Sequence, residues 1–348
     1  MSCELIAYRH FRNGDPPQLL KLWHECGLGR GAAFGITCDA LDLLVFSVQY
    51  FDARGLIVAL DGERVVGFVH AGFGSNDNGS GISPQRGVIC MIMVHPDYRR
   101  QGIGRQLVEQ AENYLRAAGT VQAQAGSAPP RDPFYLLLYG GCQAAGFLES
   151  DPLADPFFQA VGYLPVEQRF VYHRDLKTTS DPIDFRILGN RRTLQLQITD
   201  KPRTLAPWWV TRLGQLESIR FQEVPKRGGA ALAELTCIGL ETYTHTWKAR
   251  AAGLIDLFVP QELRRKGYAK TLLLDVCRRL REEQVDVVEM QVSETNPAGI
   301  GLLQSAGFKK VDTGHVYLKS LDNIVADRSA MAVNVVSQEP EGTSVRFA

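Results

Sequence analysis

Two short segments rich in arginine and glycine are the parts of this sequence best suited to bind a ligand. Residues 94–107 read VHPDYRRQGIGRQL, and residues 259–272 read VPQELRRKGYAKTL. In each segment an apolar strand ends in Val, a turn carries two arginines and a glycine, and a helix follows. The first N–H groups of a helix have no partner within it and carry the positive end of the helix dipole. Each turn therefore predicts a site for an anion the size of a pyrophosphate.

The two turns belong to an internal repeat. Gly102 aligns with Gly267 at an offset of 165 residues, whereas residues 162–172 (GYLPVEQRFVY) align with residues 307–317 (GFKKVDTGHVY) at an offset of 145. The difference of 20 predicts that the first copy holds about twenty extra residues, within the Gly-, Ala- and Pro-rich segment 119–151. A single turn of this kind is equally well explained as an ordinary strand-to-helix turn with solvated arginines, but its repetition favours the anion site.

A mixed α/β unit, used twice, accounts for the hydrophobic pattern around the turns. Residues 16–27 and 38–51 have helical apolar spacing, residues 56–74 predict a hairpin, and residues 86–96 predict a buried strand. In the second copy, residues 193–199 and 206–213 are predicted to be strands. Apolar residues predict an amphipathic helix after each turn: Ile103, Leu107, Ala111 and Leu115 in the first copy, and Leu272, Leu273, Val276 and Leu280 in the second.

The repeat and the composition predict the organisation of the chain. We expect a first domain at residues 1–174, a polar linker at 175–184, a second domain at 185–320, and a tail at 321–348 whose residues 330–336 fit an edge strand. Lys plus Arg and Asp plus Glu both number 38, and this balance argues against a nucleic-acid binder. The sequence contains no apolar run of about 18 residues, no CxxC pair and no HxxxH pair. We therefore expect a cytoplasmic protein without a membrane partner, a disulfide framework or a metal.

Residues 94–107 resemble the signature of the GNAT superfamily of acyl-CoA-dependent N-acyltransferases, which is a strand followed by Arg/Gln-x-x-Gly-x-Gly/Ala. Residues 296–308 (NPAGIGLLQSAGF) resemble the downstream block of the family. The resemblance covers nearly the whole chain and implies an α/β fold of two tandem domains, each a mostly antiparallel, splayed sheet flanked by helices. The signature falls on Arg99, Gly102 and Gly104 in the first copy and on Arg264, Gly267 and Ala269 in the second.

The resemblance implies that each turn holds the pyrophosphate of acetyl-CoA, while the pantetheine arm lies along residues 89–94 or 254–259. An amine would then attack the thioester directly. The positions implied for coenzyme A are Met93, Val94, Arg99, Arg100, Gln101, Gly102, Ile103, Gly104 and Arg105 in the first copy, and Phe258, Val259, Arg264, Arg265, Lys266, Gly267, Tyr268, Ala269, Lys270 and Asn296 in the second.

The sequence departs from the family pattern at the catalytic positions. Many members have a Tyr four residues before the glycine of the second block, which serves as the acid for the leaving thiolate. Here that position holds Phe158 in the first copy and Leu303 in the second, and neither can donate a proton. The asparagine that begins the block is present as Asn296 but is replaced by Asp151 in the first copy.

Three other residues are candidates for acid or base chemistry. Tyr135 and Tyr139 flank LLL, and alternation along a strand would place both on one face. Each is interpreted either as a packed tyrosine or as a replacement acid. Asp256 lies on the strand that precedes the second turn.

The resulting prediction is an N-acetyltransferase that moves an acetyl group from acetyl-CoA to a primary amine of a small molecule or peptide. The first copy is favoured for the reaction, and a monomer or a homodimer is expected. The alternative is a non-catalytic acyl-CoA-binding or scaffold protein, built from two degenerate domains of this kind. The identity of the acceptor and the length of the acyl chain stay open.

Overall fold

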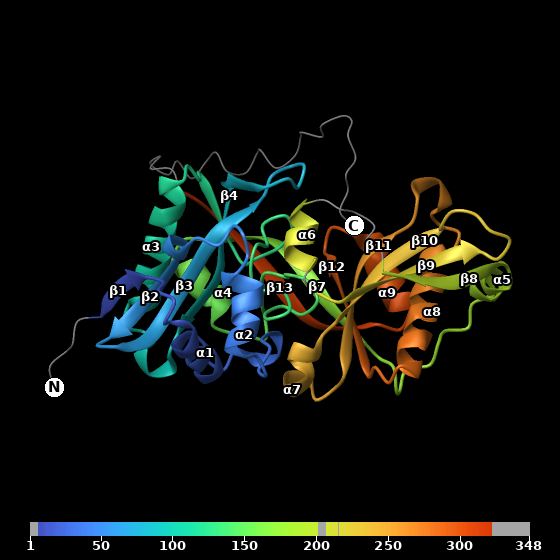
Figure 1. Ribbon diagram of the computed structural model, residues 1–348, viewed down its shortest axis with the longest axis horizontal. Helices are drawn as coiled ribbons and strands as arrows, with labels where there is room; N and C mark the ends of the chain where they lie inside the picture. Colours follow the sequence, from blue (N-terminus) through green and yellow to red (C-terminus); the bar gives the residue numbers. More distant parts are fainter. Residues whose placement is uncertain (1–5, 201–206, 215, 322–348) are drawn as a thin grey trace.

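The computed structural model describes residues 6–200, 207–214 and 216–321 (Figure 1). The expected edge strand at residues 330–336 lies outside this range. The elements of the first copy are the strands β1 (Ala7–His10), β2 (Leu56–Asp61), β3 (Arg64–Ser75), β4 (Ile82–Val94), β5 (Gln122–Ala125), β6 (Phe147–Leu148) and β7 (Leu164–Asp175), with the helices α1 (Pro16–Glu25), α2 (Cys38–Leu41), α3 (Ile103–Ala117) and α4 (Ala154–Ala160).

The second copy follows the same succession of strands around its long helix, but it has other helices before and between its first strands. The prediction of a strand at residues 206–213 is wrong over its described part, because residues 207–213 form a helix whose first position holds a proline, which suits a helix start. The elements are the strands β8 (Leu194–Thr199), β9 (Ser218–Pro225), β10 (Ala233–Gly239), β11 (Ala251–Phe258), β12 (Val287–Ser293) and β13 (Lys309–Ser320), with the helices α5 (Phe185–Thr193), α6 (Pro207–Leu213), α7 (Thr244–Trp247), α8 (Tyr268–Glu282) and α9 (Pro297–Ser305).

The strands of the described residues form one mostly antiparallel sheet that runs through both copies. Its order is β1-β2-β3-β4-β5-β13-β7-β12-β11-β10-β9-β8, and β6 also pairs with β13. The last strand of each copy is thus exchanged: β13 lies between β5 and β7 of the first copy, while β7 pairs with β12 of the second. Figure 1 shows red β13 running beside green β7 at the centre of the molecule. Each copy therefore completes its sheet with a strand of the other.

Residues 126–145 leave the sheet in the middle of a strand. β5 ends at Ala125, which pairs with Tyr317 of β13. The pairing with β13 continues at Phe147 of β6, which pairs with His315. In the second copy the corresponding strand β12 runs without a break against β7. We call residues 126–145 the insertion. It accounts for the twenty extra residues that the two repeat offsets predict.

The insertion is irregular where the sequence suggests a strand. Tyr135 and Leu137 both have left-handed backbone, with φ of 65° and 60°, and the N–H groups of Leu138 and Tyr139 both donate to the carbonyl of Tyr135. The prediction that alternation places Tyr135 and Tyr139 on one face of a strand is therefore wrong. Turn hydrogen bonds, rather than a sheet ladder, satisfy this backbone, so the two tyrosines point to different surroundings.

The hydrophobic core follows the predicted helix faces. Leu107, Ala111 and Leu115 of α3 are fully buried against the first half of the sheet, and α8 buries Leu272 and Val276 in the same way. The insertion is also buried, and the core of the first copy extends through it to residues of the second copy, including Tyr243, Ala251 and Ile255. The core of the first copy thus reaches into the second copy, whose long helix also packs over a core cluster of its own.

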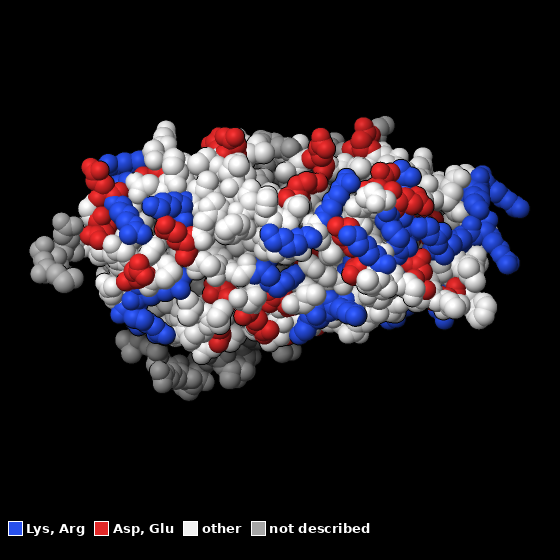
Figure 2. Space-filling view, turned by 90° about the horizontal axis from the view of Figure 1, so that it is seen from below, with Lys and Arg blue, Asp and Glu red and all other residues white. Residues whose placement is uncertain are grey.

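The surface carries an uneven distribution of charge. On the face in Figure 2, Lys and Arg side chains gather over the half of the molecule that holds the second copy, interspersed with carboxylates. Within residues 6–200, 207–214 and 216–321, no helix combines the length and hydropathy of a membrane span. The same residues contain no group of three or more His, Cys, Asp or Glu side chains that could hold a metal ion.

Candidate active site

The two arginine-glycine turns have the same backbone geometry. Gly102 and Gly267 both have a φ of +85°, and the residues that align two positions earlier, Arg100 and Arg265, have φ of 62° and 65°. Left-handed backbone at the glycine costs little because glycine has no Cβ. Each glycine directly precedes a fifteen-residue helix, α3 or α8, whose N-terminus has no side-chain cap. Both turns therefore present helix N–H groups that suit an anion.

The first arginine of each turn supports the turn. Arg99 Nε donates to the Val94 carbonyl at 2.9 Å, and Arg264 Nε donates to the Val259 carbonyl at 3.2 Å. Arg99 also donates to the Cys26 carbonyl at 3.0 Å, which ties the end of β4 to the end of α1. The side chains of Arg99 and Arg264 thus fix the strand ends.

The other implied coenzyme A positions vary in exposure. Gln101 Nε2 donates to the Asp97 carbonyl, and Arg105 donates to the Ala160 carbonyl at the end of α4. Arg100, Arg105, Arg265 and Lys266 are exposed, Met93 and Ile103 are buried in the core, and Phe258, Tyr268 and Ala269 are half-buried.

The surroundings of the two turns differ. A Cβ placed on Gly102 would meet no atom within 4 Å, so the first turn is open. A Cβ placed on Gly267 would lie 3.4 Å from the Asn190 side chain of α5. Asn190 donates to Thr271 at 2.9 Å, and Asp184, which caps α5, pairs with Lys270 at 3.2 Å. Helix α5 therefore covers part of the second turn and brings a carboxylate to it.

The strand before each turn separates from its parallel neighbour. β4 pairs with β5 only at Val88 and Ile89, and β11 pairs with β12 only from Ala251 to Gly253. β4 runs on to Val94 and β11 to Phe258 without this partner. We call the space between β4 and β6 the first splay and the space between β11 and the end of β12 the second splay. Each splay leads to a turn, as the resemblance implies.

Tyr139 of the insertion brings a hydroxyl group to the first splay. The Leu148 N–H of β6 donates to Tyr139 Oη at 3.1 Å, while the next amide, of Glu149, donates to β13. Because alternate amides of a strand point to opposite sides, the Leu148 N–H points away from β13, towards the line of β4. Burial raises the pKa of Tyr139, so its hydroxyl stays protonated at neutral pH.

Tyr135 lies in a separate aromatic cluster. Its hydroxyl lies 3.1 Å from His70 Nδ1, and the His70 ring stacks on Phe134 with 4.2 Å between the ring centroids. His70 is fully buried, and burial lowers its pKa to about 3, so the ring is neutral. Tyr135 and His70 are thus held together as a packed pair, and the Tyr135 ring stacks on Trp23 of α1.

The positions that the family uses for acid chemistry are structural here. Phe158 is fully buried and packs on Phe147, and Leu303 is buried in the second core. Asn296 caps α9 by accepting from the Gly299 N–H at 2.9 Å. Asp256 has left-handed backbone, with φ of 54°, at an irregularity in the pairing of β10 and β11.

An acidic cavity lies where α4 begins, against β7 and β13. Its volume is about 320 Å³, and its lining includes the carboxylates of Glu149, Asp151 and Asp155. His315 of β13 lies 2.9 Å from Glu149, and the Tyr317 hydroxyl donates to Asp155 at 3.1 Å. Burial raises the pKa of Asp151. The charge of this lining suits a cation.

The insertion covers the sheet beside the second splay. A Cβ on Gly253 of β11 would lie 2.2 Å from Cys142 Cβ, so only glycine fits beneath the insertion at this point. The Cys142 N–H donates to the fully buried Glu289 of β12 at 2.7 Å, and Gln291 donates to the carbonyls of Gly140 and Gln143. The second copy therefore has a partly covered turn and a covered sheet face.

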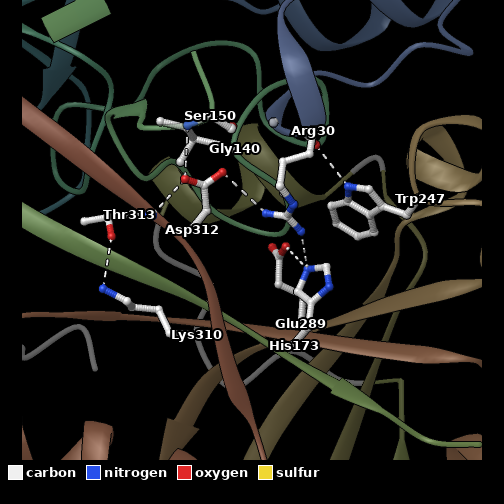
Figure 3. A network of polar contacts seen from close by, with 12 residues as sticks. Arg30, Gly140, Ser150, His173, Trp247, Glu289, Lys310, Asp312 and Thr313 are labelled. Carbon is white, nitrogen blue, oxygen red and sulfur yellow. Dashed lines mark hydrogen bonds and ion pairs between the residues drawn. The ribbon is translucent and has the colours of Figure 1, made fainter. Parts of the chain in front are cut away.

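A polar network links the two copies around Glu289 (Figure 3). His173 Nε2 of β7 lies 2.9 Å from Glu289 and 3.2 Å from the Arg30 guanidinium. Arg30 pairs with Asp312 at 3.5 Å and lies over the Trp247 ring, 5.6 Å from its centroid. Buried charges of this kind require such partners. These residues lie far apart in the chain, so their spacing in the sequence does not predict the network.

Comparisons with known proteins agree with this geometry. A family model described as "Acetyltransferase (GNAT) family" matches residues 29–137 and 197–308, more than half of the chain. No curated protein matches the sequence significantly.

Solved structures share the fold at low sequence identity. A glucosamine N-acetyltransferase region of a fungal multi-domain GH3 β-N-acetylglucosaminidase matches with a TM-score of 0.68 and 17% identity; the match covers 92% of this chain and 38% of the fungal chain. A tandem GNAT protein from the clavulanic acid biosynthesis pathway matches with a TM-score of 0.64 and 18% identity, covering 92% of this chain and all of the other. A GCN5-related N-acetyltransferase from Sphaerobacter thermophilus matches with a TM-score of 0.59 and 15% identity, covering 91% and 96%. The tandem arrangement of the two copies is thus found in another protein.

Proposed function

Because the chain belongs to the acetyltransferase (GNAT) family, we propose that it transfers an acetyl group from acetyl-CoA to a primary amine, and that the first copy does so. The observation that carries this proposal is the pairing of an open helix-start turn at Gly102 with a hydroxyl group, that of Tyr139, in the adjoining splay. The second copy has no such pairing among its described residues, since α5 and the insertion cover it. We propose that the second copy supports the first.

The first turn fits the pyrophosphate of acetyl-CoA. Its glycine leaves open space, and the helix N-terminus behind it has no side-chain cap. The exposed side chains of Arg100 and Arg105 add positive charge. These groups would hold the phosphates by charge-assisted hydrogen bonds, while Arg99 keeps the end of β4 in place.

Bound acetyl-CoA supplies a thioester, whose carbonyl carbon forms a bond to the amine nitrogen while the carbon–sulfur bond breaks. We propose that Tyr139 holds the proton that the leaving thiolate needs. Its oxygen accepts from the Leu148 N–H, and its own O–H has no acceptor among the described residues. The amine releases its proton to solvent, and solvent reprotonates Tyr139.

The acceptor is proposed to be a small molecule or peptide that carries at least one positive charge. Glu149, Asp151 and Asp155 bring three carboxylates to the cavity of about 320 Å³ that begins beside α4. Such a lining attracts amines and repels anionic acceptors. The fungal neighbour is named for glucosamine acetylation, and an amino sugar of this size therefore belongs in the first set of acceptors to test.

One observation favours a second candidate function, which is acyl-CoA binding without turnover. Both positions at which the family carries its acid are core residues, because Phe158 is fully buried and Leu303 is 2% exposed. In this case the turn would bind coenzyme A, and Tyr139 would serve only to close the insertion onto β6.

Thiol release from acetyl-CoA, measured with a panel of amino sugars, polyamines and peptides, distinguishes the two functions. We expect turnover with a cationic amine, and a loss of kcat of at least tenfold in Tyr139→Phe with little change in KM. Tyr114→Phe is the matched control, since the Tyr114 hydroxyl donates to Asp52 away from the splay. Binding of acetyl-CoA without turnover across the panel would favour the second function. Full turnover in Tyr139→Phe would remove Tyr139 from the mechanism.

A further inference from the structure

The surface around helix α5 combines strongly exposed apolar side chains with positive charge. Ile183 is 90% exposed and Phe185 is 86% exposed, immediately before and at the start of α5. Leu188, one turn later, is 48% exposed, whereas Ile187 is the residue of the helix that is buried. Single exposed apolar residues are common on proteins, but three within six residues form a patch.

Exposed cations lie on α5 itself and on the second turn, which α5 contacts. The α5 residue Arg186 lies against the second turn, since its Cβ is 3.6 Å from a Cβ placed on Gly267. That turn exposes Arg265 and Lys266. In the described part of the chain, Arg186, Arg265 and Lys266 form no ion pair with a carboxylate, in contrast to Lys270, which Asp184 neutralises. The charge on this surface is therefore available to a partner.

We propose that this surface, which we call the α5 face, binds the surface of an anionic phospholipid membrane. The cations would contact the lipid headgroups, and Ile183, Phe185 and Leu188 would enter the boundary between headgroups and acyl chains. The apolar side chains of the α5 face are strongly exposed, which suits a fluid, flat partner. Two of its three apolar side chains are aliphatic, and these favour a bilayer over the stacked bases of a nucleic acid.

This binding differs from the expectation of a protein without a membrane partner, and it is independent of acyl transfer. It requires no membrane-spanning helix, since a peripheral protein binds through such a patch. Membrane binding also gives the second copy a role of its own. The second turn keeps the cations of the repeat, while α5 occupies part of the space that a pyrophosphate would need there.

Flotation of the full chain with vesicles tests the proposal. The vesicles are phosphatidylcholine alone or phosphatidylcholine with 30% phosphatidylglycerol, at low and at physiological salt. We expect binding to the anionic vesicles only, and a bound fraction that falls as salt screens the charges. The double variants Ile183→Ser/Phe185→Ser and Arg265→Glu/Lys266→Glu should each lower the partition coefficient at least tenfold.

Two control variants carry the same chemical changes elsewhere. Leu164→Ser/Val166→Ser removes two exposed apolar side chains from β7, and Arg100→Glu reverses a charge in the first turn. Both should float like the unchanged protein. The proposal is overturned if the chain does not bind anionic vesicles at low salt, if it binds neutral vesicles equally well, or if the control variants lose as much binding as the α5-face variants. Binding to single-stranded RNA with no binding to vesicles would also overturn it.

Discussion

A carboxylate introduced into each turn separates the contributions of the two copies to coenzyme A binding. The variants are Gly102→Glu and Gly267→Glu. Both glycines have a φ of +85°, so any other residue suffers the same backbone strain, about 1–2 kcal/mol. The two variants should therefore lose similar folding stability. Any difference between them in ligand binding reports on the surroundings of the turns.

The expected loss of affinity follows from the open space at Gly102, where an added side chain meets no atom within 4 Å. A carboxylate about 5 Å from each phosphate, at an effective dielectric constant of about 40, repels each negative charge by about 1.7 kcal/mol. Two phosphates give about 3.4 kcal/mol, which corresponds to a roughly 300-fold increase in Kd. At Gly267 we expect less than a threefold change, because Asn190 and Arg186 already occupy the neighbourhood of that turn.

The assay is calorimetric titration of each full-length variant with coenzyme A and with acetyl-CoA. Gly102→Ala is the control for strain without charge, and it should bind within about threefold of the unchanged protein. Thermal unfolding of the two Glu variants checks that their stabilities are equal. A loss in Gly267→Glu as large as that in Gly102→Glu would refute the assignment of the ligand to the first copy, and no binding by the unchanged protein would refute the transferase proposal itself.

Three further predictions concern stability. Gly253→Ala places a Cβ 2.2 Å from Cys142 Cβ, so it should lower the free energy of unfolding, measured in urea, by about 2–3 kcal/mol. The double variant that adds Cys142→Gly should recover part of this loss, and additive losses would contradict the contact. Burial, together with the nearby Asp275, raises the pKa of Glu223 to about 8. Between about pH 4.5 and pH 8 the folded chain therefore holds a proton that the unfolded chain releases, and the stability of the fold falls as pH rises through this range. Glu223→Gln should remove a pH dependence on the order of 2–4 kcal/mol, seen as a smaller difference in Tm between pH 6 and pH 9. Burial lowers the pKa of His70 to about 3, so His70 favours the folded state above pH 6.5 and loses that contribution as pH falls towards 3. His70→Phe should therefore reduce the loss of stability between pH 6.5 and pH 3. An unchanged slope over this range would argue against a buried neutral ring.

The parts of the site that are local in sequence were predictable. Each turn is encoded within fourteen residues, and the drop in repeat offset from 165 to 145 predicted the length of the insertion. The helices after the turns were predicted from apolar residues four positions apart, such as Leu107 and Ala111, whose side chains are fully buried. The proposed domain boundaries at residues 174 and 185 stay a prediction.

The parts that depend on tertiary contacts were not predictable. β7 and β13 share the same sequence pattern, so the residues of each strand do not indicate whether it pairs within its own copy or with the other copy. The strand expected around Tyr135 and Tyr139 is a turn, because contacts with both copies override the alternating pattern. The hydrogen bond between Tyr139 and the Leu148 amide depends on the return of the chain from the insertion, which sequence spacing does not reveal.

The exchange of β7 and β13 has a consequence for synthesis on the ribosome. β7 ends at Asp175, but the strand that must lie between it and β5 ends only at Ser320. At about 5–20 residues per second, the intervening chain takes roughly 7–30 seconds to emerge. During that time the nascent first half exposes the edges of β5 and β7, which are ready to pair with other chains. We therefore expect the two halves to close together, after the second copy has left the ribosome.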